Sequence, residues 1–162
     1  MDRKQAFRAF TDSIRHDDHA RFVELAVSEP EHLKMTTPFG TWLHVAASHG
    51  RMETVRYLVE SGVDVNARGG VANGTPLHDA ASEGHLDVID YLFRKGAILD
   101  TSEPSCNPLF AAIYGGHVDV AKYVIENGLD PTIRYSGDNM DNMDALAFAQ
   151  ERGQSQFFVL LS

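Results

Sequence analysis

Eight histidines and one cysteine are the side chains of this sequence best suited to bind a metal or act as a nucleophile. A catalytic thiol needs a nearby base that lowers its pKa, and the sequence around Cys106 supplies none. Hydrolase, phosphate-loop, dinucleotide and His-Glu-x-x-His motifs do not occur. We therefore predict no enzyme activity, no metal site and no cofactor. Four histidines are scattered without the short spacing of zinc ligands: His16, His19, His32 and His49.

Composition places limits on the class of protein. The chain has 162 residues and a formal net charge of −9, and 43% of its residues are hydrophobic. This length and apolar content predict a single globular domain, and the negative charge disfavours nucleic-acid binding and favours a basic protein partner. One cysteine, no signal peptide and no long apolar run predict a cytoplasmic protein without membrane contact. We expect a monomer in the absence of its partner.

Three segments repeat one pattern at fixed intervals. Leu43, Leu77 and Leu109 are separated by 34 and 32 residues. Two sets of glycines show the same two intervals, which indicates internal repeats and not chance. These sets are Gly50, Gly84 and Gly116, and Gly62, Gly96 and Gly128.

The middle copy shows how each unit should fold. Thr75 is suited to cap a short helix, and Pro76 fits its first position. Gly84 ends this helix with a positive φ, and His85 then opens a second helix. The second helix has an apolar stripe of helical period, made of Val88, Ile89, Leu92 and Phe93.

The run Thr75-Pro76-Leu77-His78, followed by Ala80-Ala81, resembles the core of the ankyrin repeat. This resemblance implies an all-α solenoid of about five helix-turn-helix units with extended finger loops and degenerate capping units. It gives one domain, 1–162, with an N-terminal cap 1–35, central repeats 36–68, 69–101 and 102–134, and a C-terminal cap 135–162. It also implies that His44 and His78 bond loop backbone and that His85 and His117 start outer helices.

Three departures from the repeat pattern affect the expected packing or binding surface. Trp42 replaces the usual proline, and we expect it to fill the junction with the N-terminal unit. The alternative is an exposed anchor for a partner. Phe110 replaces the usual histidine and is expected in the core. The insertion within 133–143 is expected on the binding face or as a turn-rich connector.

The resemblance also implies that partners bind the concave side, formed by inner helices and finger loops. The family's variable positions map onto the residues before each turn glycine, onto loops 37–39, 68–73 and 102–105, and onto the insertion. In the N-terminal unit the corresponding pair is His16-Asp17. For any single position the alternative is a solvated loop residue. The predicted partner-binding residues are His49, Arg68, Asp79, Ser82, Glu83, Glu103, Tyr114, Tyr135, Asp138, Asn139, Met140, Asp141, Glu151 and Arg152.

A closer resemblance concerns function. The segments 42–50, 107–117 and 142–149 look like those of small stand-alone bacterial ankyrin proteins. Many such proteins resemble immunity proteins that are paired with secreted toxins. The resemblance therefore implies a protein-binding module that neutralises a cognate toxin. The alternative is a cytosolic scaffold or regulatory adaptor that binds another cellular protein, and both hypotheses use the same surface.

Overall fold

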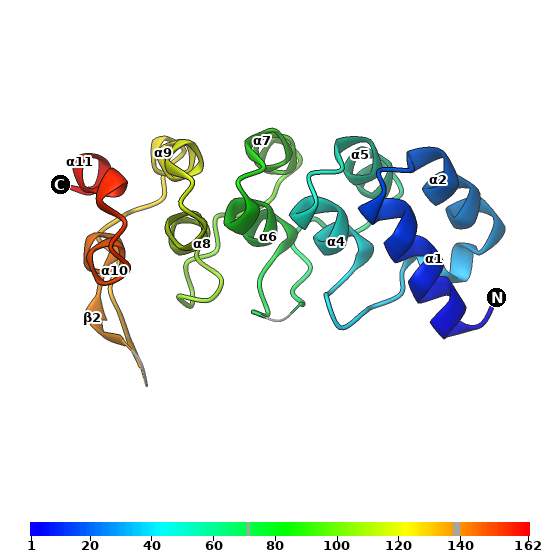
Figure 1. Cartoon of the computed structure of the whole chain (residues 1–162), viewed down its shortest axis with the longest axis horizontal. Coiled ribbons are helices and arrows are strands. Elements are labelled where there is room, and N and C mark those ends of the chain that lie inside the picture. Colours follow the sequence, from blue (N-terminus) through cyan, green and yellow to red (C-terminus); the bar gives the residue numbers. More distant parts are fainter. Residues whose placement is uncertain (71, 138–139) are drawn as a thin grey trace.

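The computed structural model describes residues 1–70, 72–137 and 140–162. In Figure 1 the helices lie in two rows, and loops extend from the inner row to one side. Consecutive inner helices contact one another along the row. No described helix is both long and apolar enough to cross a membrane. The inner helices are α1 (Arg3–Arg15), α4 (Trp42–Ser48), α6 (Pro76–Glu83), α8 (Pro108–Gly115) and α10 (Ala145–Glu151). The outer helices are α2 (His19–Ser28), α5 (Met52–Glu60), α7 (Leu86–Arg94), α9 (Val118–Glu126) and α11 (Phe158–Leu161). Helix α3 (Pro30–Leu33) follows α2, and a 3-10 turn (Ser155–Phe157) precedes α11.

The mostly helical architecture agrees with the prediction, and the middle unit shows its local causes. The Thr75 side chain accepts a hydrogen bond from the backbone N–H of His78, and Pro76 occupies the first turn of α6. Gly84 ends this helix at φ 79°, a conformation that disfavours any residue with a Cβ. The helix ends are therefore fixed by these residue types. The unit boundaries given above stay predictions.

Histidines connect neighbouring units through the backbone. The Nε2 atoms of His85 and His117 lie 3.1 Å from the carbonyl oxygens of Ser48 and Ser82, each in the preceding unit. His44 Nδ1 accepts from the Thr41 N–H at 3.1 Å, and Nε2 donates to the Gly74 carbonyl at 3.3 Å. Burial lowers the pKa of His44 below its ordinary 6.5. The structural roles predicted for these three histidines are confirmed.

His78 does not follow this prediction. Its Nδ1 lies 3.3 Å from the Asp79 carboxylate, and no hydrogen bond joins its ring to loop backbone within the described residues. The ring is half-buried at the inner surface of α6. The His78 ring thus faces the side chain of its neighbour in sequence, Asp79.

The two aromatic departures from the repeat pattern are both buried. Trp42 is fully buried, stacks on Phe10 with ring centroids 5.1 Å apart, and donates from Nε1 to the His32 carbonyl at 2.9 Å. Trp42 therefore fills the junction with the N-terminal unit and is not an exposed anchor. Phe110 is 4% exposed and stacks on Phe148 at 4.7 Å, as expected for a core residue.

The insertion contains a short β-hairpin, which the all-α prediction did not include. Strands β1 (Tyr135–Gly137) and β2 (Met140–Met143) pair antiparallel, with Tyr135 opposite Met143. An ion pair of 2.7 Å between Arg134 and Asp144 closes the base of the hairpin. The described strands of the insertion are thus paired with each other, unlike a connector made of turns alone. The two strands have only three and four residues. An alternation of polar and apolar residues over so few positions does not predict a strand.

Candidate protein-binding groove

A groove runs along the inner helices and is made of three adjoining cavities. The first cleft, of about 360 Å³, lies between α4 and α6, and a second cavity of about 520 Å³ lies between α6, α8 and α10. A third cavity of about 550 Å³ follows along α10. Neighbouring cavities share lining residues, so they adjoin one another along the inner helices, and together they are called the groove. The shared residues are Ala72, His78 and Ser82 for the first pair, and Met140 and Phe148 for the second.

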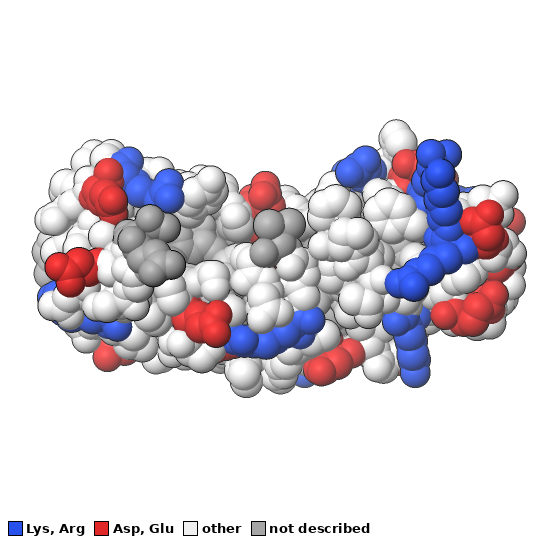
Figure 2. Space-filling view, turned by 90° about the horizontal axis from the view of Figure 1, so that it is seen from below, with Lys and Arg blue, Asp and Glu red and all other residues white. Residues whose placement is uncertain are grey.

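The charge of the chain is unevenly distributed around this surface. Figure 2 views the molecule from the side toward which the finger loops extend. Lys and Arg side chains gather there at the N-terminal end, and the middle of this side is mostly uncharged. The formal net charge of −9 is therefore not concentrated on this side. Any attraction of a basic partner to the groove depends on particular carboxylates.

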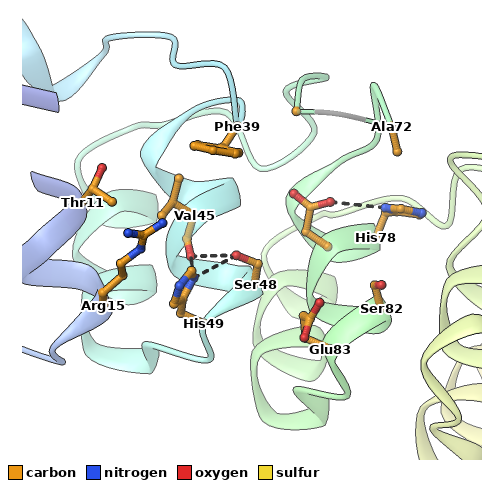
Figure 3. A pocket seen from close by; sticks show the side chains of 12 residues that line it. Thr11, Arg15, Phe39, Val45, Ser48, His49, Ala72, His78, Ser82 and Glu83 are labelled. Atoms are coloured by element: carbon orange, nitrogen blue, oxygen red, sulfur yellow. Dashed lines mark hydrogen bonds and ion pairs between the residues drawn. The ribbon is translucent and has the colours of Figure 1, made fainter. Parts of the chain in front are cut away.

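Those carboxylates lie on one wall of the first cleft. Asp79 and Glu83 line the α6 side, whereas Arg15 from α1 and His49, directly after α4, line the opposite side. Figure 3 shows Phe39 above the space between these walls. The Phe39 side chain is 46% exposed. The cleft therefore has an acidic wall, a basic wall and an aromatic edge.

The second and third cavities are organised by aromatic rings and one arginine. Tyr114 is 60% exposed, and the Arg152 guanidinium carbon lies 4.4 Å from its ring centroid. Arg152 also lies 4.9 Å from the ring centroid of Phe148, which in turn stacks on Phe110. Such cation–π contacts are attractive and orient the rings. Tyr114 is thus an exposed aromatic side chain held in place before any partner binds, a property of interface hot spots.

Two of the predicted binding residues connect neighbouring finger loops. Arg68 forms an ion pair with Asp100 and a hydrogen bond of 2.8 Å with Ser102. Tyr135 donates to the Thr101 carbonyl and accepts from Asn107 Nδ2, both at 2.9 Å. These side chains stabilise loop geometry, so their polar groups are already engaged without a partner.

The Asp100 carboxylate is held in its ionised form. Its partial burial opposes ionisation, but hydrogen bonds from Ser102 and Arg68 outweigh that effect and lower its pKa from 3.8 to about 2. Burial of the Tyr135 hydroxyl raises the pKa of that side chain. The contacts between these loops therefore include a carboxylate that stays ionised at neutral pH.

The groove brings together part of the predicted set of residues. Arg68, Glu103, Tyr135 and Asp141 do not line any of the three cavities, whereas Asp138 and Asn139 lie outside the described residues. The predicted residues that do line the groove are His49, Asp79, Ser82, Glu83, Tyr114, Met140, Glu151 and Arg152.

The N-terminal unit contributes a different residue from the predicted pair His16-Asp17. His16 Nδ1 lies 2.8 Å from the Asp12 carbonyl and caps α1, and Asp17 pairs with Arg51 at 3.5 Å. Arg15, which the sequence analysis did not identify, lines the first cleft instead. The first unit has Asp17 at its turn, with φ 58°, where the other units have glycine. The missing glycine left the register of this unit ambiguous in sequence.

One group of potential metal ligands occurs among the described residues. Carboxylate oxygens of Glu29 and Glu31 and a ring nitrogen of His32 lie within 4.8 Å of one another. The Glu29 carboxylate already pairs with the N-terminal ammonium of Met1 at 3.1 Å, and His32 Nε2 lies 3.1 Å from the Met1 carbonyl oxygen. This group therefore has a structural explanation, since it ties down the chain terminus.

Comparison with known proteins agrees with the repeat pattern. A family model described as ankyrin repeats (3 copies) matches residues 12–103, which is more than half of the chain. The matched span contains α4 to α7 and all but one of the residues that line the first cleft. A search of curated proteins finds no match to this chain.

Proposed function

The chain belongs to the ankyrin-repeat family, and from that premise we propose that it is an immunity protein that neutralises a cognate secreted bacterial toxin by binding it in the groove. Ankyrin repeats indicate a protein-binding module. The observation that carries the placement of the partner is the cluster of Tyr114, Phe148 and Arg152. It offers a preformed aromatic surface within the groove.

The immunity assignment is supported by the resemblance of segments 42–50, 107–117 and 142–149 to small bacterial ankyrin proteins of that type. Neutralisation by occlusion requires only a rigid surface of standard interface size, about 800 Å² on each partner. The inner helices contact their neighbours along the stack, which supports a rigid surface. No cofactor or metal is part of this proposal.

The adaptor hypothesis uses the same groove but differs in its consequence for the partner. An immunity protein abolishes the activity of its partner, whereas an adaptor leaves that activity intact and changes its location or assembly. Binding alone therefore does not separate the two hypotheses. The activity of the partner in the complex does.

The decisive experiment is co-expression with the product of the neighbouring gene, with cell growth and pull-down as paired readouts. We expect the neighbouring product to inhibit growth alone, and the native chain to restore growth and to co-purify with it. The double variant Tyr114→Ala, Arg152→Ala should lose both effects. Glu60→Lys on α5 is the matched control, because Glu60 is exposed and forms no ion pair with a described residue.

A complex that forms without any change in growth or in partner activity would favour the adaptor hypothesis. Full protection by the double variant, with loss of protection in Glu60→Lys, would place the partner on the outer helices. Either outcome would refute the corresponding part of the proposal.

A further inference from the structure

The acidic wall of the first cleft is specific to one helix. Asp79 and Glu83 lie four residues apart on α6, so both side chains occupy the same face of the helix. The aligned positions are Val45 in α4 and His49 directly after it, and Ala111 and Gly115 in α8. Two carboxylates on one face are therefore a feature of this groove position and not of the repeat pattern.

These two carboxylates have little compensation from the protein itself. Glu83 is exposed and forms no ion pair or hydrogen bond with a described residue. Asp79 has one such contact, with the ring of His78 at 3.3 Å. The other titratable groups that line the cleft are Arg15 and His49, and both belong to the opposite wall. The α6 wall thus presents negative charge to a ligand in the cleft.

An aromatic ring adjoins the same space. Phe39 stacks on Phe7, with ring centroids 6.4 Å apart and planes at 19°, and is 46% exposed. Figure 3 shows its ring at the edge of the cleft, across from the α6 side chains. An aromatic ring next to carboxylates favours a planar cation over a compact one. A guanidinium stacks on the ring while its N–H groups donate to the carboxylates.

We propose that the first cleft accepts an arginine side chain of the protein partner, with its guanidinium between Phe39 and the carboxylates of Asp79 and Glu83. This specifies the chemistry of the partner and rests on the proposed function of the groove. The volume of about 360 Å³ is at the small end of ligand pockets, which suits one side chain. Arg15 lines the opposite wall, so the guanidinium of the partner is expected on the α6 side of the cleft, away from Arg15.

The test is an NMR titration of the full, ¹⁵N-labelled chain with N-acetyl-arginine amide. Its uncharged isostere, N-acetyl-citrulline amide, and N-acetyl-lysine amide serve as comparison probes. We expect saturable shifts at the amides of Phe39, Asp79 and Glu83. Binding of the citrulline probe should be about tenfold weaker because it lacks the charge, and binding of the lysine probe should lie between the two.

The double variant Asp79→Asn, Glu83→Gln should lose the shifts, whereas Glu60→Gln should keep them. The spectrum of each variant reports directly whether it is folded. Equal binding of the arginine and citrulline probes, or no saturable shift in the native chain, would overturn the inference. Partner binding that is sensitive to groove variants would still support the proposed function in that case. Probe binding together with groove-independent partner binding would instead refute the proposed function.

Discussion

The guanidinium of Arg152, at the end of α10, lies 4.4 Å from the ring centroid of Tyr114 on α8. The same guanidinium lies against Phe148, so one cation orients two rings of the groove. Tyr114 stays 60% exposed in this arrangement. An aromatic side chain that is ordered before binding loses less conformational entropy when a partner covers it. The pair therefore combines accessible apolar area with a fixed orientation.

Tyr114→Ala should weaken binding of the partner by about 2 kcal/mol or more, as expected for a central aromatic anchor. Most of this loss should appear as a faster dissociation rate. Arg152→Ala should have a smaller effect of the same sign. Because Arg152 acts partly by orienting Tyr114, the double variant should cost less than the sum of the single variants, by about 0.5–1 kcal/mol. Biolayer interferometry on the four chains measures this coupling. Strict additivity would show that the two residues act independently.

Glu83→Lys should slow association with a basic partner and make the association rate less sensitive to salt, because it reverses a charge of the acidic wall. Stopped-flow association at several ionic strengths measures both effects. Glu60→Lys is the matched control with the same change of charge on the outer surface, and it should alter the rate less. Asp90 is unsuitable as a control, since it accepts from the Tyr123 hydroxyl at 3.0 Å and pairs with Arg94. A larger effect of Glu60→Lys than of Glu83→Lys would argue against groove binding.

Sequence alone was sufficient for features that depend on local chemistry. The helix ends at Thr75 and Gly84 follow from capping and from positive φ, and the burial of Phe110 follows from its position in the repeat. The membership of Tyr114, Glu83 and Asp79 in the groove also follows from that register. The helix ends and the positions that face the groove recur in each unit, so one well-matched unit predicts where they lie in the others.

Several specific contacts between distant residues were not predictable from the sequence. Arg68 meets Asp100, 32 positions away, and Tyr135 meets Thr101, 34 positions away, so their structural roles appear only in the fold. The contribution of Arg15 to the first cleft was missed for a similar reason. Its position depends on how α1 packs against α4, and the first unit lacks the glycine that fixes the register elsewhere.

Leu77→Asp should unfold much of the chain, because Leu77 is 1% exposed in the core of the stack. An unpaired buried charge costs several kcal/mol, which is a large part of a typical domain stability of about 5–15 kcal/mol. Val159→Asp is the control, since Val159 is 94% exposed and the change should be nearly neutral. Thermal melts followed by circular dichroism compare the two. An unchanged melting temperature in Leu77→Asp would contradict the assignment of Leu77 to the core.

The Asp100 contacts predict a dependence of stability on acid. The folded state holds the pKa of Asp100 at about 2, below the ordinary 3.8, so the unfolded chain binds more protons between these values. The stabilisation of the folded state by Asp100 is complete above pH 3.8 and is lost as the pH falls toward 2. Asp100→Asn should melt below the native chain at neutral pH, and the difference should shrink across this window. A difference in melting temperature that stays constant down to pH 2 would show that Asp100 does not contribute this acid dependence.

Hydroxyl-radical footprinting of the isolated complex tests the groove assignment most directly, because it reports solvent access at individual side chains. Met140 lines the groove and Met52 lies on the outer helix α5, and both are partly exposed in the free chain. This pair has identical chemistry, so any difference reflects location. We predict that the partner strongly reduces oxidation of Tyr114, Phe39 and Met140 and leaves Met52 unchanged. Protection of Met52 with unchanged oxidation of Tyr114 and Met140 would contradict binding in the groove.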